Sequence, residues 1–282
     1  MNNLKRFLIK FFFHTPRIIF INFYRMILRK RIFHLQRLPV DRPAILAVNH
    51  VTGADPIILL ASIRKKIIFL ADNKCFETRI TDFFFRTMAN SMPVFKQQFS
   101  RNIKTFKELF NIFKSPKNRN GNVFLGIFPE GRLNKNISLS EFFKGTAYLS
   151  YKMKLPIIPV YMSNLFKGPI KKEWFLKRPV LEGLVTIFIN AFKRIHIFIG
   201  EPIEPLAENI FYDMKSIADR NRYKNTIDKI NTALASEFEK LESEAKSIVA
   251  KLTSEKSSYI SADESEDEDD VFKVNDLASD SE

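Results

Sequence analysis

The chain has 282 residues and carries 45 Lys and Arg against 31 Asp and Glu, a net charge of +14. Its apolar fraction of 45% is enough for the core of one domain with appendages. The single cysteine, Cys75, excludes an internal disulfide and has no Cys or His companion at metal-ligand spacing, so we expect a reducing compartment and no metal site.

The charge is divided unevenly along the chain. From residue 261 onward there are ten Asp or Glu and one Lys, or −9, which leaves +23 for residues 1–260. A basic body attracts anionic partners such as membrane headgroups, CoA, phosphorylated substrates or nucleic acid. No zinc-finger, basic-zipper or RNA-recognition signature is present, and the basic residues are scattered among Phe and Ile, so no nucleic-acid partner is expected.

The first 38 residues are strongly apolar and aromatic. A bilayer-spanning helix needs about 20 apolar residues, and every window of that length is interrupted by Lys10, His14, Arg17 or Arg25. Pro16 divides the segment into two helical pieces, which we expect to lie in the membrane interface with their cationic side chains reaching the headgroups. The alternative is a helix pair that only covers the core.

A short apolar run at residues 44–48 predicts a buried strand, and the sequence NHVTGADP follows it at 49–56. His50 and Asp55 are five residues apart across a turn that contains Gly53, so the two side chains can meet. A carboxylate that accepts a hydrogen bond from one ring nitrogen leaves the other nitrogen as a base for a substrate hydroxyl. The alternative is structural, because Asp55 followed by Pro56 is also typical of a helix start with Asp as its N-cap.

The next part of the chain alternates between helical and strand patterns. Such alternation predicts an α/β fold, with a mostly parallel sheet flanked by helices. Predicted helices span residues 57–63, 103–114 and 142–153, and predicted strands span residues 67–71, 157–162 and 196–200. The remaining histidines, His14, His34 and His196, lack a neighbouring carboxylate and are expected to be structural or interfacial.

A second motif, FPEGR at 128–132, also follows a short apolar run, at residues 123–127. Both motifs therefore lie just past predicted strand ends. In open α/β sheets, ligand sites are built at this edge. A His and a carboxylate past one strand, and a Glu and an Arg past another, predict a site there.

The two motifs, together with Lys144-Gly145 and the run LPIIPV at 155–160, resemble the glycerolipid acyltransferase superfamily, which includes glycerol-3-phosphate and 1-acylglycerol-3-phosphate acyltransferases. The four motifs agree in order and spacing over residues 43–204. The resemblance implies that His50 is the general base and that Asp55 orients it, so that a glycerol alkoxide attacks the thioester of acyl-CoA directly. It also implies substrate-binding roles for a further set of residues: Glu130, Gly131 and Arg132 at the glycerol phosphate, Lys144, and Pro159 on the acyl-donor side.

The chain departs from the family pattern in two places. Relatives carry a Gly-rich second motif that ends in Arg, whereas the corresponding stretch here is NSMPVFK at 90–96. Lys96 then replaces the phosphate-binding Arg, with Arg86 and Arg101 nearby as further cations. The third motif reads FPEGRLN without the usual Thr before Arg, which brings Arg132 one position early.

Three later segments complete the expected organisation. Residues 180–192 are apolar but too short to span a bilayer, and are expected either to dip into one leaflet or to form a core helix or strand. Residues 213–251 have the periodicity of one or two amphipathic helices, and the acidic end is expected to be disordered. The predicted domains are membrane-interface helices at 1–38, an acyltransferase domain at 39–210, amphipathic helices at 211–255 and a disordered tail at 256–282.

These features predict a membrane-bound, acyl-CoA-dependent O-acyltransferase of phospholipid synthesis. Lysophosphatidate is the favoured acceptor because the chain is short; glycerol-3-phosphate is the alternative acceptor, and a catalytically silent membrane-binding scaffold is the alternative of another class. No cofactor is expected, because acyl-CoA is a co-substrate. The Phe-, Asn- and Lys-rich composition favours the endoplasmic reticulum membrane of a eukaryotic cell, with the site facing the cytosol.

Overall fold

A computed structural model describes residues 15–95, 99–118, 120–133, 142–166, 179–205 and 216–276, of which 99–100, 179–182 and 253–276 are described by their backbone alone. The chain divides into two compact units, Met1–Leu241 and Glu242–Glu282. The motifs at 49–56, 128–132 and 155–160 all lie in the first unit. The four domain boundaries expected from composition stay predictions.

In the described part of the chain, seven strands form one mixed sheet in the order β1-β7-β6-β2-β5-β3-β4. Every neighbouring pair is parallel except β6 and β7, which are antiparallel. The predicted α/β class with a mostly parallel sheet is therefore confirmed. The strands are β1 (Lys30–Phe33), β2 (Ala44–Val48), β3 (Lys66–Asp72), β4 (Ser91–Val94), β5 (Val123–Ile127), β6 (Ile157–Ser163) and β7 (Ile195–Ile199).

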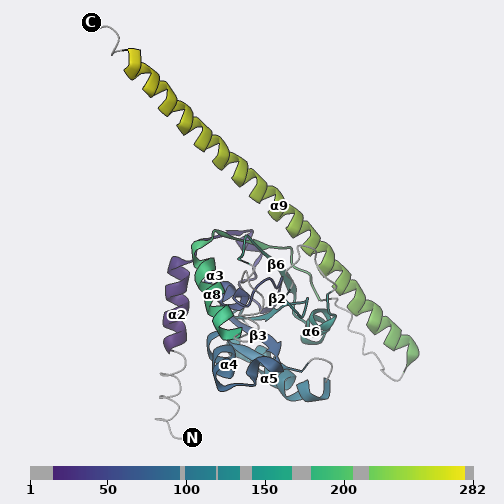
Figure 1. Cartoon of the computed structure of the whole chain (residues 1–282). Helices are drawn as coiled ribbons and strands as arrows, with labels where there is room; N and C mark the ends of the chain where they lie inside the picture. Colours follow the sequence, from purple (N-terminus) through teal and green to yellow (C-terminus); the bar gives the residue numbers. More distant parts are fainter. Residues whose placement is uncertain are drawn as a thin grey trace. The chain divides into compact units, whose positions relative to one another are not determined.

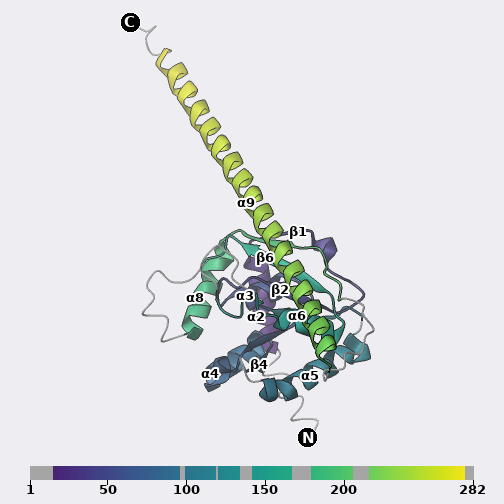
Figure 2. The same cartoon turned by 90° about the vertical axis from the view of Figure 1, so that its right-hand side faces the viewer.

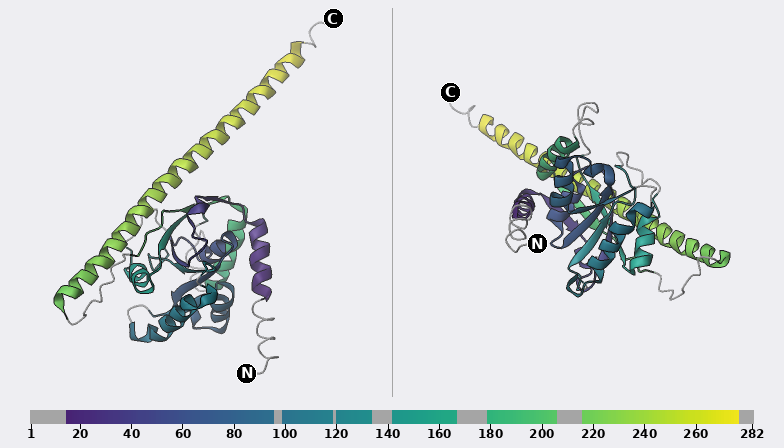
Figure 3. Two further views of the ribbon diagram at one scale, coloured as in Figure 1. Left: turned by 180° about the vertical axis from the view of Figure 1, so that it is seen from behind. Right: turned by 90° about the horizontal axis from the view of Figure 1, so that it is seen from below.

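Helices cover both faces of this sheet (Figures 1 and 2). α2, α3 and α8 contribute to the apolar cluster on one face, whereas α5, α6 and the first part of α9 contribute to the cluster on the other. The view from below in Figure 3 shows the strands between these helices. The helices are α2 (Thr15–Ile27), α3 (Asp55–Ser62), α4 (Arg79–Phe83), α5 (Ile103–Lys114), α6 (Gly145–Met153), α8 (Pro179–Phe192) and α9 (Ile217–Asp276), with short turns at η2 (Leu35–Arg37), η3 (Asn73–Phe76), η4 (Phe84–Met88), η5 (Phe99–Asn102) and η6 (Pro116–Asn118).

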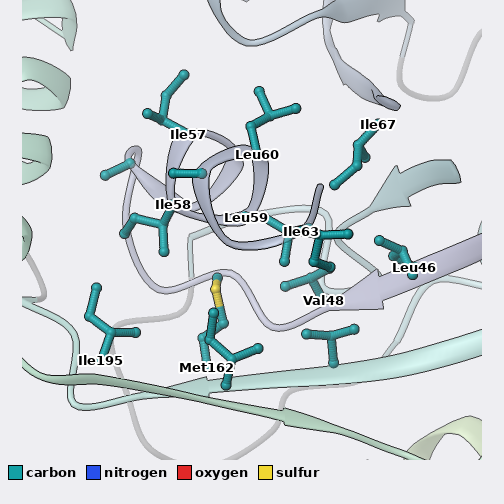
Figure 4. Close-up of a cluster of buried hydrophobic side chains, with 14 of the residues drawn as sticks. Leu46, Val48, Ile57, Ile58, Leu59, Leu60, Ile63, Ile67, Met162 and Ile195 are labelled. Atoms are coloured by element: carbon teal, nitrogen blue, oxygen red, sulfur yellow. The ribbon is translucent and has the colours of Figure 1, made fainter. Parts of the chain in front are cut away.

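α3 holds the start of the site against the sheet. Its sequence DPIILLAS is almost wholly apolar, and all eight residues are buried. Figure 4 shows α3 beside the strands that carry Leu46, Val48 and Met162. Because removal of this apolar surface from water is strongly favourable, the position of Asp55 at the first turn of α3 is set relative to the end of β2.

The predicted elements of this unit are confirmed, with shifts of a few residues at some ends. β2, β5 and α5 have the predicted bounds. α3 begins two residues before its predicted start, β7 begins at Ile195, and α6 begins at Gly145 rather than at 142. Apolar runs and helical periodicity locate an element, whereas the capping and turn contacts that decide its ends are not visible in them.

The predictions for the two ends of the chain are tested only in part, because some of the residues concerned are not described. α2 confirms the second piece of the predicted N-terminal helix pair, while residues 4–13 lie outside the described residues. No helix in the described ranges combines the length and apolarity needed to cross a bilayer. α9 continues as one helix beyond residue 251 and enters the acidic stretch for which disorder was predicted; residues 277–282 lie outside the described residues.

Candidate active site

Two neighbouring parallel strands bring the two principal motifs to the same end of the sheet, just past the last residues of both strands. β2 and β5 pair in register from Ala44 with Phe124 to Ala47 with Ile127. The chain leaves both strands in the same direction, so NHVTGADP and FPEGR emerge side by side, as their strand patterns predict. The backbone N–H of His50 donates to Oε1 of Glu130 at 3.0 Å, which joins the two motifs directly.

His50 and Asp55 form a hydrogen-bonded pair. Nδ1 of His50 lies 2.9 Å from Oδ2 of Asp55, and the same oxygen accepts the backbone N–H groups of Val51 at 2.8 Å and Thr52 at 2.9 Å. A carboxylate held by backbone donors accepts from the ring as well, so Nδ1 carries a proton and Nε2 is the nitrogen that can accept one. The His50 side chain keeps 20% of its surface exposed, while that of Asp55 is fully buried.

α3 begins at Asp55 as the structural alternative expected, but Asp55 is not its N-cap, so that part of the alternative was wrong. The N-cap position is Ala54, and Asp55 is the first helical residue. Thr52 closes the turn instead, because its Oγ1 accepts the Ala54 N–H at 3.0 Å and its carbonyl oxygen accepts the Asp55 N–H at 3.2 Å. The turn does not depend on glycine: Gly53 has no left-handed φ, and a Cβ there would meet no atom within 4 Å.

Glu130 supports the base from the neighbouring strand. The residue is only 2% exposed, and its hydrogen bond to the His50 N–H holds the backbone from which the imidazole projects. Gly131 turns the chain after it with φ +59°, and its N–H donates to the Phe128 carbonyl oxygen at 3.0 Å. A Cβ at Gly131 would lie 2.8 Å from the Phe143 ring, so glycine is required there. A direct contact of Glu130 and Gly131 with the substrate stays a prediction.

An aromatic column holds the plane of the imidazole. The Phe128 ring stacks on His50, with centroids 4.0 Å apart and planes 20° apart, and Phe69 stacks on Phe128 with centroids 5.8 Å apart. Phe69 pairs with Gly126 across the sheet, and a Cβ at Gly126 would lie 2.3 Å from the Phe69 ring. The sequence reasoning missed this column, although a glycine inside an apolar strand is a signal of close approach.

Asn49 fastens the same motif to β6, and the sequence reasoning missed this residue too. Its Nδ2 donates to the Met162 carbonyl oxygen at 3.0 Å and its Oδ1 accepts the Met162 N–H at 2.7 Å. The Asn49 backbone N–H also donates to the Val160 carbonyl oxygen at 3.3 Å. His50 is therefore held from both neighbouring strands, through Glu130 on the β5 side and through Asn49 on the β6 side.

The cations expected to bind phosphate are not all free to do so. Arg132 follows the Gly131 turn with an exposed side chain, and no described residue pairs with its guanidinium. Lys144 forms an ion pair with Asp228 of α9. Lys96 lies outside the described residues.

The two arginines near the second motif are engaged with neighbours. Arg86 donates from Nε to Oδ1 of Asp82 at 2.7 Å, and its guanidinium lies 4.9 Å from the Phe76 ring centroid. The Arg101 guanidinium lies over the Phe95 ring at 5.3 Å. Among the cations predicted to bind phosphate, Arg132 is thus the one whose exposed side chain has no partner among the described residues.

Pro159 lies inside the sheet rather than at its open edge. It pairs with Ala47 of β2, is buried, and accepts the Gly200 N–H on its carbonyl oxygen at 2.8 Å. Its role on the acyl-donor side stays a prediction. Within the described ranges, no three His, Cys, Asp or Glu side chains are grouped as metal ligands, and a metal-free reaction likewise stays a prediction.

Comparison with known proteins gives a family match over the residues that carry His50, Asp55 and Glu130. Residues 30–163 match the family model described as "Acyltransferase", and the match confirms the resemblance predicted from the motifs. A sequence search of curated proteins found no match. Among solved structures, the crystal structure of the 1-acyl-sn-glycerophosphate (LPA) acyltransferase PlsC from Thermotoga maritima is similar, with a TM-score of 0.48 and 16% identity over 80% of this chain and 81% of that chain.

Proposed function

We propose that this chain, whose residues 30–163 belong to the acyltransferase family, moves a fatty acyl group from acyl-CoA to the free hydroxyl of 1-acyl-sn-glycerol-3-phosphate. The observation that carries the proposal is the His50–Asp55 pair, with Nδ1 and Oδ2 2.9 Å apart and Nε2 left as the proton acceptor. Glycerol-3-phosphate is the alternative acceptor.

The proposed reaction needs one base and one charge partner. Nε2 of His50 takes the hydroxyl proton as the oxygen attacks the thioester carbonyl, and the buried Asp55 carboxylate stabilises the imidazolium that forms. This attack forms the ester C–O bond and gives a tetrahedral intermediate, which collapses with restoration of the C=O bond and cleavage of the C–S bond. His50 then returns the proton to the departing CoA thiolate, so the enzyme ends unchanged.

The proposed phosphate contact is Arg132. Its guanidinium can donate two parallel hydrogen bonds to a phosphate, and it follows directly on the turn that supports the base. We expect Arg132→Ala to raise KM for the phosphorylated acceptor by about tenfold, and Arg132→Lys to restore part of it. An unchanged KM for the acceptor in both variants would place the phosphate elsewhere.

We further propose that the reaction takes place at a membrane, on the cytosolic side of the endoplasmic reticulum. The acceptor and the acyl chain of the donor are amphipathic, and the body of the protein carries a charge of +23 over residues 1–260. A basic protein collects at anionic bilayer surfaces, where both substrates also collect.

The test is acyl transfer from labelled oleoyl-CoA to lysophosphatidate and, separately, to glycerol-3-phosphate, with wild-type and His50→Ala protein in membranes. Transfer to lysophosphatidate alone, lost in the variant, supports the proposal. Transfer to glycerol-3-phosphate alone would change the acceptor, and transfer only from an acyl carrier protein thioester would change the donor. No transfer with any donor or acceptor would favour the scaffold alternative.

A further inference from the structure

Over residues 183–192, α8 buries two polar side chains beside Ile187 and Ala191, and exposes several large apolar side chains. Thr186 and Asn190 are buried, and Asn190 donates to the Thr186 carbonyl oxygen at 2.8 Å and accepts the Phe166 N–H at 2.7 Å. Leu184, Phe188 and Phe192 follow one another at helical spacing on the exposed side, and Phe188 is 65% exposed. A water-facing helix of a globular domain has the opposite arrangement.

α2 also exposes large apolar side chains and directs polar groups inward, although Ile21 is buried as well. Its inward side chains include Arg25, which donates to the carbonyl oxygens of Leu60 and Ala61 at 3.1 and 3.0 Å, and Tyr24, which donates to the Ile187 carbonyl oxygen at 2.9 Å. The exposed side is apolar apart from Asn22, and includes Ile18, Ile19, Phe23 and Met26. Met26 is the most exposed of these, at 84%.

The two helices are neighbours on the same face of the sheet. The Tyr24 hydrogen bond to Ile187 joins them midway, and the Arg29 N–H donates to the Ala191 carbonyl oxygen at 3.5 Å where both helices end. Figures 1 and 3 show α2 as an outer helix of this layer. The outer side chains of α2 and α8, named here the α2/α8 face, are Ile18, Ile19, Phe23, Met26, Leu184, Phe188 and Phe192.

Positive charge gathers near the end of this face where both helices finish. The described residues 15–40 contain six Lys or Arg and no acid, and residues 183–200 contain Lys193 and Arg194 and no acid. Of these cations, Arg37 forms an ion pair with Glu201 at 2.7 Å. Burial lowers the pKa of Lys30, and the nearby Arg25 and Arg64 lower it further, as expected where cations gather without anionic partners. Lys30 also donates to the Arg25 carbonyl oxygen at 3.4 Å.

We propose that the α2/α8 face docks on a bilayer surface that contains anionic phospholipid, with Phe23, Phe188 and Phe192 inserted among the acyl chains and the basic residues at the helix ends on the headgroups. Exposed apolar surface of this extent indicates an interaction site, and the adjoining positive charge selects an anionic lipid surface as the occupant. The inference rests on the proposed function in taking the membrane as the place of reaction. Its test measures binding alone.

The test is sedimentation of the full chain with vesicles of phosphatidylcholine, with and without phosphatidylserine. We expect wild-type protein to bind the anionic vesicles more tightly, and raised salt to weaken this preference. The double variant Phe188→Ser and Phe192→Ser is expected to lower the vesicle partition coefficient by about tenfold or more. The matched control is Ile103→Ser on α5, an exposed apolar residue on the opposite side of the sheet, which should leave binding unchanged.

Several outcomes would overturn the inference. Unchanged vesicle binding in the double variant would show that α8 does not insert, and an equal loss in the Ile103→Ser control would show that the effect is not specific to this face. Self-association of the wild type that the double variant lacks, without vesicle binding, would assign the face to a second copy of the chain. Vesicle binding through α8 in a wild-type protein without acyl transfer would support the inference and remove the proposed reaction.

A second measurement does not depend on removing apolar side chains. In a Trp174→Phe background, Phe188→Trp and Ile103→Trp each place one indole on a known side of the sheet. We expect brominated phospholipid in anionic vesicles to quench the fluorescence at position 188 and to leave that at position 103 largely unquenched. Equal quenching at both positions would contradict the inference.

Discussion

Two regions of the molecule depart from the usual placement of charged side chains at the surface and apolar side chains in the core. Charged groups are buried at the end of the sheet where β2 and β5 finish, whereas apolar groups are exposed on the α2/α8 face. At the sheet edge, the carboxylates of Asp55 and Glu130 are buried, and each accepts backbone N–H donors. On the α2/α8 face, phenylalanine side chains such as Phe188 are exposed. Burial of a charge is costly unless it is hydrogen-bonded, and a large apolar patch is rarely left to water. Each reversal therefore indicates where the chain is adapted to something other than its own stability.

The largest effect that would test the first half of this comparison is expected for Asp55→Asn. The amide keeps one acceptor oxygen but removes the charge that stabilises the imidazolium, so we expect kcat to fall by about 10³- to 10⁴-fold. Steady-state kinetics on a variant with a native circular dichroism spectrum measures it. A decrease of less than about tenfold would mean that the carboxylate has only a structural role.

The second prediction concerns the neighbouring strand. Glu130→Ala leaves the buried His50 N–H without its acceptor, which we expect to lower the free energy of unfolding by about 1–3 kcal/mol and kcat by about 10- to 100-fold. Glu130→Gln keeps an oxygen at the same position and should recover most of the stability. Chemical denaturation and kinetics of both variants separate the hydrogen bond from the charge. Equal stability of the alanine and glutamine variants would contradict this account of the buried contact.

The third prediction concerns the packing of Gly126 against the Phe69 ring, below the stack of Phe128 on His50. Gly126→Ala would force a Cβ to within 2.3 Å of the Phe69 ring, and we expect about 1–3 kcal/mol of destabilisation together with a lower kcat, because the ring shift reaches His50 through Phe128. The matched control is Gly53→Ala, where no atom lies within 4 Å of the new Cβ and stability should stay within about 0.5 kcal/mol. Thermal unfolding measures the stability of both variants. An equal loss of stability in the two would contradict the close packing of Gly126 against the Phe69 ring.

The fourth prediction tests the inverted arrangement of α8. Asn190→Leu removes the acceptor of the Phe166 N–H, and we expect it to cost about 1–3 kcal/mol although it adds an apolar residue. Phe188→Asn, two residues earlier, removes an apolar side chain but should change the free energy of unfolding in buffer by no more than about 0.5 kcal/mol. Denaturant titrations without lipid compare them, and the opposite ranking would show that α8 is turned the other way.

The smallest effect concerns a histidine outside the site. Burial lowers the pKa of His196, and Arg194 and Arg31 lower it further. Below about pH 6.5, the ordinary pKa of histidine, the unfolded chain binds more protons at this residue than the folded chain, so stability falls as the pH decreases. Denaturant titrations near pH 7.5 and pH 5.5 should show a smaller loss at the acid pH in His196→Leu than in the wild type. An equal loss in both proteins would mean that His196 does not contribute to the acid destabilisation.

The sequence predicted the parts of the site that depend on near neighbours. β2, β5 and α5 have the predicted bounds because a continuous apolar run and a helical period are local properties. The His50–Asp55 pair was also predictable, since five residues and one turn are enough to bring the side chains together. The contact of Glu130 with the His50 N–H joins residues 80 positions apart, and no local pattern specifies which atom the carboxylate will meet.

The sequence by itself therefore predicted the fold class, the resemblance to an acyltransferase family whose model matches residues 30–163, and the contact between His50 and Asp55, because residue types, apolar runs and motif spacing can be read along the chain. Only the tertiary structure decided the rest: that Lys144 is engaged with Asp228, that Phe128 stacks on the base, and which side of α8 faces outward. The polar residues of the segment 180–192, Glu182, Thr186 and Asn190, recur every four residues and mark one side of a helix, but the sequence does not show whether that side faces the rest of the chain or water. Its orientation is decided by the hydrogen bonds of its few polar residues with the chain around them.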